Sequence, residues 1–175
     1  MNQARLITLA AIIIAGAAAR LLPHPPNFTP VAAMALFAGA MMAPRLLAFV
    51  VPLGAMLLSD LVIGVGDGSH MPYVYGAFAL TVLMGMAIRG RVGLGSVPLT
   101  ALGASVLFFG LTNFGAWLGT GLYPQTAEGL WAAYVAGIPF FAHTLAGNLF
   151  FSALFFGGFA LAERHQPALR EGLSA

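Results

Sequence analysis

The chain has 175 residues, of which 60% are hydrophobic and only 7% are charged. An average soluble domain carries about 25% charged residues, and so few charges cannot cover a globular surface without leaving large apolar patches. The composition therefore excludes an ordinary soluble enzyme and a disordered chain, and it predicts an integral membrane protein. The absence of cysteine also excludes disulfides, thiolate catalysis and cysteine-type metal sites.

Six apolar segments are separated by turn-forming or charged residues. In chain order the predicted spans are Leu6–Leu22, Phe28–Ala43, Leu46–Val65, Pro72–Ile88, Val97–Leu118 and Pro139–Ala162. A spanning helix needs about 20 apolar residues, so the chain has room for these spans and for no soluble domain. We expect the short second segment to be partly irregular and Gly119–Ile138 to be a long loop. The prediction is an all-α membrane protein with one domain, residues 1–175, folded as a six-transmembrane-helix bundle.

The arginines predict the orientation of this bundle. Threading six spans places six of the seven arginines on one side and only Arg20 on the other. Because arginine-rich loops stay in the cytoplasm, we expect a multi-pass protein of the bacterial inner membrane with both termini cytoplasmic. The scattered arginines form no basic patch, which argues against nucleic acid as a partner. A cleaved signal peptide, with Ala17–Ala19 as its cleavage site, remains an alternative for the first segment.

The few polar side chains gather toward the outer half of the predicted bundle. Since a polar residue in lipid must face protein or a water-filled cavity, this asymmetry predicts a ligand cavity that opens outward. The predicted substrate-binding residues are His24, Asn27, Asp60, Asp67, His70, Tyr75, Asn113, Trp117 and His143. Other interpretations stay open. Trp and Tyr are common interfacial anchors, and Asn148 fits a helix–helix hydrogen bond. Asp60 fits either hydration at the end of a span or a pair with Arg20 or a histidine.

Small residues recur on one face of the first segment. Ala11, Ala15 and Ala19 are spaced by four residues, which aligns them along a helix and allows close helix approach in membranes. The stripe fits either packing within the chain or docking of a partner's helices. No two histidines have metal-motif spacing and no Ser lies in a G-x-S-x-G context. We therefore predict neither a metal site nor catalytic residues.

These features resemble the substrate-binding subunits, or S components, of energy-coupling-factor vitamin transporters. The resemblance rests on the alanine stripe and on Pro52–Leu61, whose Pro-and-Gly start and acidic end resemble the third helix of those subunits. The chain is also similar, along nearly its whole length, to an uncharacterised bacterial family described as membrane transport proteins. The shared pieces are Leu22–Pro30, Ser59–Leu61, Thr112–Leu118, Tyr123–Thr126 and Gly137–Phe141.

The resemblance implies a substrate-binding subunit for vitamin uptake rather than an enzyme. The alanine stripe would dock a coupling transmembrane subunit, and separate ATPases would supply energy because the chain has no Walker A motif. Solitary S components for cobalamin are similar in size, which makes a corrinoid the candidate ligand, with no cofactor of the protein's own. His24, His70 and His143 are then the candidate cobalt ligands. An ion- or proton-coupled carrier, a membrane-embedded metal-dependent enzyme and a structural partner without a ligand remain alternatives.

Overall fold

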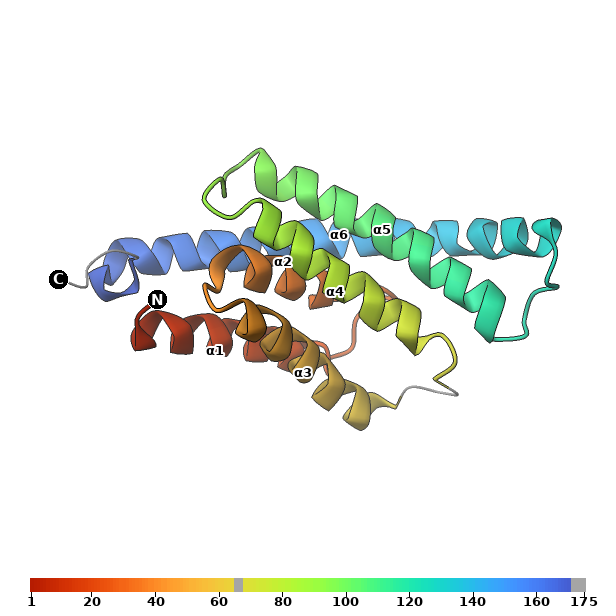
Figure 1. The fold of residues 1–175 in the computed structure, drawn as a ribbon, viewed down its shortest axis with the longest axis horizontal. Coiled ribbons are helices and arrows are strands. Elements are labelled where there is room, and N and C mark those ends of the chain that lie inside the picture. The colour runs from red at the N-terminus through yellow and green to blue at the C-terminus, as the bar shows by residue number, and fades with distance from the viewer. Residues whose placement is uncertain (65–67, 171–175) are drawn as a thin grey trace.

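The computed structural model describes residues 1–64 and 68–170, and within them it is all-helical. The elements are α1 (Gln3–Ala19), α2 (Val31–Met41), α3 (Arg45–Ile63), α4 (Met71–Ala87), α5 (Ser96–Gly119), α6 (Ala127–His165) and a short 3-10 helix, η1 (Pro167–Leu169). Consecutive helices alternate in direction, so the two termini lie at the same end of the molecule (Figure 1). The predicted all-helical fold class is confirmed.

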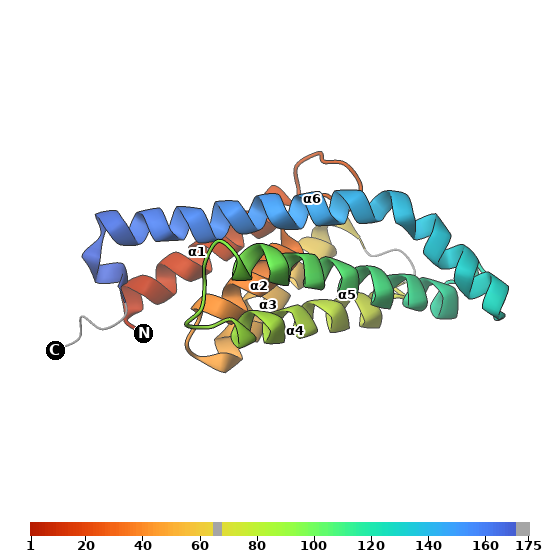
Figure 2. The ribbon, with the colours of Figure 1, turned by 90° about the horizontal axis from the view of Figure 1, so that it is seen from above.

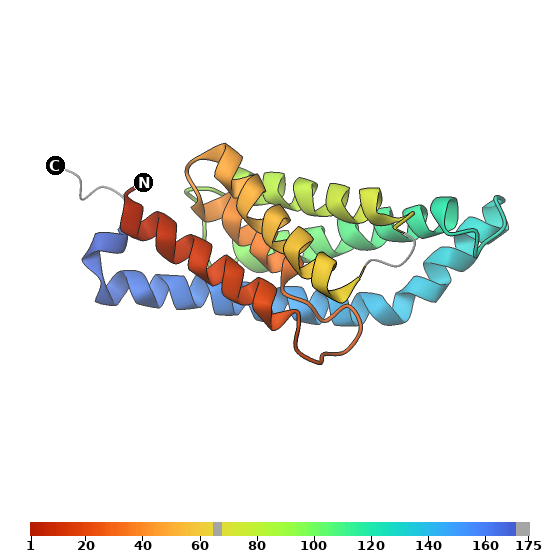
Figure 3. The same cartoon turned by 90° about the horizontal axis from the view of Figure 1, so that it is seen from below.

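Three of the helices are long and apolar enough to cross a membrane, namely α3, α5 and α6. The other three are also apolar but shorter, with 17 residues in α1, 11 in α2 and 17 in α4. Outward-facing side chains on α3 are strongly apolar, and Leu58 and Leu61 are 67% and 74% exposed. The face on which α1 and α3 lie is seen in Figure 3. Such a surface is typical of protein in contact with lipid rather than water.

Helix α2 forms the centre of the fold because its sequence, VAAMALFAGAM, is apolar around the whole circumference. All its residues from Val31 to Ala40 are buried, and it packs against α3, α4 and α6. Phe37 meets the rings of Phe156 and Phe159 edge-on, with centroids 5.1 and 5.9 Å apart. At about 1.5 Å per residue, α2 crosses only about half of a hydrocarbon core of about 30 Å.

Two glycines bring α2 and α4 into backbone contact. A Cβ atom at Gly39 would overlap the carbonyl oxygen of Val82, and one at Gly85 would overlap the carbonyl oxygen of Leu36. Only glycine fits at such an approach, so this pair sets the distance between the two helices.

Helix α2 is shorter than the predicted segment Phe28–Ala43 for a local reason. The preceding stretch contains Pro25, Pro26 and Pro30, and Asn27 has a positive φ of 62°. Proline lacks the N–H that a helix interior needs, and a left-handed residue breaks helical geometry. Residues 20–30 therefore form an irregular connection, and the expected partial irregularity of the second segment is confirmed.

The predicted loop over Gly119–Ile138 is wrong in its second part, because α6 already begins at Ala127. Thr126 caps the helix by accepting a hydrogen bond of 3.2 Å from the Gly129 amide, and Glu128 lies favourably in the first turn. Pro139 is accommodated inside the helix, and α6 bends in this N-terminal part (Figure 2). With 39 residues, α6 is about 58 Å long and exceeds the thickness of a bilayer core.

Candidate functional site

The end of the bundle away from the termini contains a buried network that joins α1, α3 and α4. Arg20, just after α1, forms an ion pair with Asp60 of α3 and donates a hydrogen bond of 2.7 Å to Ser59. Tyr75 of α4 donates its hydroxyl to the other Asp60 oxygen at 2.8 Å. The Asp60 side chain is only 3% exposed, and a carboxylate buried to this degree requires such partners. The predicted alternative of an ion pair between Asp60 and Arg20 is thus present.

A second feature of this end is a pair of adjoining cavities, of about 80 and 30 Å³, between the start of α2 and the helices α5 and α6. Both cavities are lined by Asn27, Phe108 and Thr144. The larger one adds Phe109, Thr112, Asn113, Gly137, Phe140 and Phe141, and the smaller one adds Thr29, Ala32 and Phe78. Among the described residues that line these two cavities, hereafter the Asn27 cavities, none is charged.

The polar groups of the Asn27 cavities are oriented by helix backbone. The hydroxyls of Thr112 and Thr144 donate to the carbonyls four residues earlier, at 2.8 and 3.0 Å. The Asn113 amide nitrogen likewise donates to the Phe109 carbonyl at 2.8 Å. These hydrogen bonds use both hydroxyl donors and one of the two amide donors of Asn113, and they leave oxygen lone pairs as acceptors. The cavities therefore offer hydrogen-bond acceptors surrounded by phenylalanine rings.

Two glycines of α6 permit the close contacts that this arrangement requires. The Asn113 amide lies over Gly137 of α6, in the space that a Cβ atom at that position would occupy. Gly147 similarly allows the backbone of Phe28 and Thr29 to lie against α6, with the Thr29 nitrogen 3.1 Å from where a Cβ atom would be. The glycines thus let the irregular 20–30 connection and α5 approach α6 on either side of the cavities.

The buried N-terminus of α2 faces the same cavities. Pro30 occupies the N-cap position, and no described side chain caps the helix there. The first amides of a helix have no intrahelical acceptor, and Val31, Ala32 and Ala33 are all buried. Because Ala32 lines the smaller cavity, the uncapped first turn of α2 borders the same cavity as the polar groups supplied by α5 and α6.

The structure separates the predicted site residues into groups. Asn27 and Asn113 line the Asn27 cavities, whereas Asp60 and Tyr75 belong to the Arg20 network. His24 is exposed, with its ring nitrogens near the Arg20 and Pro25 carbonyls at 3.2 and 3.1 Å. Asp67 lies outside the described residues.

The remaining predicted residues lie at the helix ends or on an outer surface. The Trp117 indole donates to the Pro124 carbonyl at 2.9 Å and so holds the α5–α6 connection. His70 precedes α4, and its buried Nδ1 atom has no hydrogen-bond partner among the described residues. His143 is exposed on α6. Within the described part of the chain, no three His, Asp or Glu side chains are grouped as metal ligands would be.

The sequence-based selection missed Thr29, Thr112 and Thr144. A signal for Thr144 is present, because Gly137, Thr144 and Asn148 follow the spacing of one helix face. His143 is selected because it is a polar residue within an apolar segment, but it is one position away, and one residue turns a side chain by about 100° around the helix. Gly137, Thr144 and Asn148 are buried, whereas His143 is exposed.

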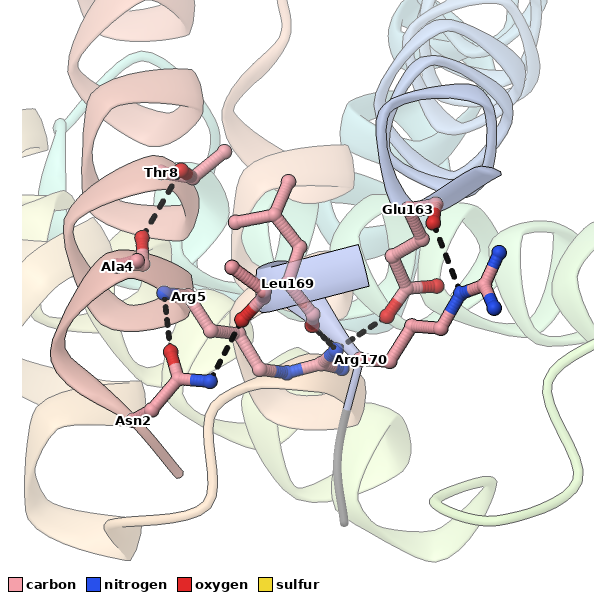
Figure 4. Close-up of polar contacts among 8 residues, drawn as sticks. Asn2, Ala4, Arg5, Thr8, Glu163, Leu169 and Arg170 are labelled. Atoms are coloured by element: carbon pink, nitrogen blue, oxygen red, sulfur yellow. Dashed lines mark hydrogen bonds and ion pairs between the residues drawn. The ribbon is translucent and has the colours of Figure 1, made fainter. Parts of the chain in front are cut away.

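The end of the bundle that carries the termini contains arginines that form an ion pair and hydrogen bonds to backbone carbonyls. Arg5 of α1 pairs with Glu163 of α6, donates to the Leu169 carbonyl at 2.6 Å and lies 4.9 Å from the centre of the Phe159 ring. Asn2 and Arg170 add hydrogen bonds to Ala168 and Glu163, so this cluster ties the two termini together (Figure 4). Arg89 lies at the same end and donates to the carbonyls of Gly39 and Met42, at 2.8 and 2.6 Å.

Comparison with known proteins identifies a family and nothing more specific. No curated protein and no solved structure matches the chain. A family model described as "Family of unknown function (DUF6580)" matches residues 1–169. Because this match covers nearly the whole sequence, the chain belongs to the DUF6580 family.

Proposed function

We propose that the protein is an integral membrane subunit that binds a small organic solute of the vitamin class for uptake, as the S components it resembles do. In this proposal all six helices are embedded in the bacterial inner membrane, with both termini in the cytoplasm. The alternating helix directions and the arginines at the end with the termini support that orientation. The short α2 is accommodated because it is enclosed by its neighbours and does not face lipid. With 17 residues each, α1 and α4 lie at the lower limit of spanning length.

The observation that carries the proposal is the combination of the Asn27 cavities with the uncapped, buried start of α2. Broken or half-length helices that expose backbone donors inside a membrane protein typically mark substrate sites in transporters. Ligand pockets in general combine apolar walls with a few oriented polar groups. The Asn27 cavities meet this description, with phenylalanines as walls and Asn27, Asn113 and Thr144 as polar groups.

The chemistry of the cavities favours a particular class of ligand. Acceptor oxygens from Thr112, Asn113 and Thr144 suit a ligand with N–H or O–H donors, and the phenylalanines suit a flat ring. Without a charged side chain among the described lining residues, an uncharged heterocycle is favoured over a strongly ionic solute. Cavities of about 80 and 30 Å³ hold only a few atoms, whereas pockets for vitamin-sized ligands occupy about 300 Å³ or more. Binding of any such solute, and most of all of a corrinoid such as cobalamin, therefore requires the outer connections to move apart.

A partner for energy coupling is part of the proposal. Ala11 and Ala15 are exposed on α1 and Ala19 is partly exposed, so the stripe is available to a coupling transmembrane subunit. Bulky substitution at Ala15 is then expected to block association with that subunit while leaving solute binding intact. The opposite outcome, loss of binding with intact association, would contradict the assignment of the stripe.

The test is to measure binding of riboflavin, thiamin, biotin and cobalamin to the purified protein, together with mass spectrometry of small molecules that it retains. The Asn113→Leu variant removes a cavity acceptor, and Leu122→Asn is a matched control at an exposed position of the α5–α6 connection. We expect one solute to bind to the wild type and to the control but not to Asn113→Leu. If none of the four binds and nothing is retained, the vitamin-uptake proposal fails.

A further inference from the structure

A cavity of about 260 Å³ lies at the end of the bundle that carries the termini, apart from the Asn27 cavities. It is enclosed by Arg5 of α1, the C-terminal end of α2, and Arg89 and Val92 of the α4–α5 connection. With about 30 Å³ for each water molecule in the liquid, the space corresponds to roughly nine waters. It therefore has room for a tetrahedral anion with part of its ester substituent.

The charge in this cavity is positive. Arg5 and Arg89 are the only charged side chains among the described residues that line it. Glu163 is paired with Arg5, whereas the charge of Arg89 faces the carbonyls of Gly39 and Met42, which carry only partial charges. In the sequence of the segments that meet at this end, Arg45, Arg91, Arg164 and Arg170 add to Arg5 and Arg89, against the acidic residues Glu163 and Glu171. An anion is the ligand that this balance favours.

Arg89 has a donor available for such an anion. One terminal nitrogen, Nη2, donates to the carbonyls of Gly39 and Met42. The other, Nη1, makes a single long hydrogen bond of 3.4 Å among the described residues, to the Ala43 carbonyl, which leaves one of its N–H groups for a ligand. A guanidinium presents its donors in a plane that matches phosphate oxygens, so a bound phosphate oxygen would accept from Nη1.

An apolar groove adjoins the cavity at Val92, which lines both. The groove has a volume of about 340 Å³ and lies between the start of α5 and the C-terminal half of α6. On α6 it extends from Ala160 back to Leu149, which is about 16 Å along a helix. It thus runs from the arginine-bearing end toward the middle of the bundle, the direction that an acyl chain takes in a bilayer.

The geometry points to a binding site for an anionic phospholipid, with its phosphate in the Arg5–Arg89 cavity and one acyl chain in the α5–α6 groove. Basic cavities between helices on the cytoplasmic side of membranes are suited to anionic headgroups, and the adjoining groove provides the matching apolar surface. A free phosphate shares the headgroup chemistry but makes no use of the groove.

The site is tested by native mass spectrometry of the full-length protein in detergent, with phosphatidylglycerol, phosphatidylcholine or inorganic phosphate added. Gly157→Leu fills the groove, because Gly157 lines it and a Cβ atom there meets nothing within 4 Å. Gly158→Leu is the matched control, since its Cβ atom is equally free and Gly158 does not line the groove. Arg89→Gln probes the headgroup, with Arg91→Gln as its exposed control.

We expect phosphatidylglycerol to be retained by the wild type, Gly158→Leu and Arg91→Gln, and at least about tenfold less by Gly157→Leu and Arg89→Gln. Should Arg89→Gln fail to fold, the Gly157→Leu comparison decides alone. Equal retention of phosphatidylcholine, or retention that Gly157→Leu leaves unchanged, would overturn the proposal in favour of unspecific lipid around the protein. If millimolar inorganic phosphate displaces phosphatidylglycerol, the cavity binds phosphate without help from the groove, and the assignment of a phospholipid as the ligand is wrong. Neither result depends on whether the Asn27 cavities bind a vitamin.

Discussion

The two ends of α2 differ in how the rest of the chain completes them. At the C-terminal end, Arg89 donates hydrogen bonds to the carbonyls of Gly39 and Met42. At the N-terminal end, Pro30 supplies no cap, no described side chain replaces it, and the first buried turn borders the Asn27 cavities. A buried helix end without partners is unfavourable. The difference teaches that the protein's own side chains complete one end of α2, whereas in our proposal a ligand completes the other end.

The two ends of the bundle also differ in the side chains that hold the surrounding helices together. The arginine-bearing end is held by the Arg5–Glu163 pair and by hydrogen bonds that tie both termini together. At the other end the buried Arg20–Asp60–Tyr75 network joins α1, α3 and α4 but includes neither α5 nor α6. The cavities lie on the α5–α6 side of this network. We therefore expect different residues to determine stability and the proposed ligand binding at that end, and the two properties can be tested separately.

The largest expected effect is a loss of stability when the buried Arg20–Asp60–Tyr75 network is disrupted. Asp60→Ala leaves Arg20 without its partner in a mostly buried position, and such a change typically costs about 3–5 kcal/mol of unfolding free energy. Glu163→Ala at the other end is the matched comparison, and we expect a smaller loss because Arg5 keeps its hydrogen bond to the Leu169 carbonyl and its contact with the Phe159 ring. Thermal unfolding of the purified proteins in detergent measures both. Equal losses would show that these remaining contacts of Arg5 do not compensate for the lost ion pair.

The next largest effect is expected for the backbone contact between α2 and α4 at Gly39 and Gly85. Gly85→Ala forces the α2 and α4 backbones apart, and overpacking of this kind typically costs about 1–3 kcal/mol. Gly54→Ala is the control, because a Cβ atom there meets nothing within 4 Å and alanine is the better helix former. Unfolding midpoints should fall for the first variant only. A Gly85→Ala variant as stable as the wild type would contradict the backbone contact.

A smaller effect is expected for a cavity residue. Thr144→Val removes an acceptor oxygen from the Asn27 cavities without changing the side-chain shape, so affinity for the bound solute should fall by up to about tenfold. Thr100→Val is matched, because Thr100 also bonds to the carbonyl four residues earlier and lines neither cavity. Titration with the solute identified from the vitamin set compares the two variants. Equal weakening in both would place the site elsewhere.

The smallest effect is expected at His143. Its side chain is exposed on α6, so His143→Ala should change the unfolding free energy by no more than about 0.5 kcal/mol. Solute affinity should also be unchanged. A large loss of binding would restore His143 as a ligand-contacting residue and would place the site on the outer surface of α6.

Much of the fold was predictable because apolar segments in a membrane protein are interrupted by visible breaks. The bounds of α3, α4 and α5 agree with the predicted segments to within about two residues. The sequence does not predict the start of α6, because the Gly, Pro and Glu residues near 119–139 are also typical of a loop. In the structure Thr126 and Glu128 begin a helix there, and Pro139 bends that helix without ending it.

The candidate site was less predictable because it depends on which face of each helix is buried. The sequence placed Asn27, Asn113 and Asp60 at one end of the bundle, but it did not show that Asp60 joins Arg20 while the asparagines line cavities. The importance of α2 was also hidden. Its all-apolar sequence resembles a lipid-facing span, and only the packing of α3, α4 and α6 around it shows that it is enclosed.

The most direct test of the central claim is cysteine labelling, for which a chain without cysteine is well suited. Thr112→Cys lies in the Asn27 cavities, Leu122→Cys in the connection at the same end, and Arg91→Cys at the arginine-bearing end. In spheroplasts with a membrane-impermeant maleimide, we expect Thr112→Cys and Leu122→Cys to be labelled from outside, and Arg91→Cys only after lysis. Labelling of Arg91→Cys from outside, with Thr112→Cys labelled only after lysis, would contradict an outward-facing site.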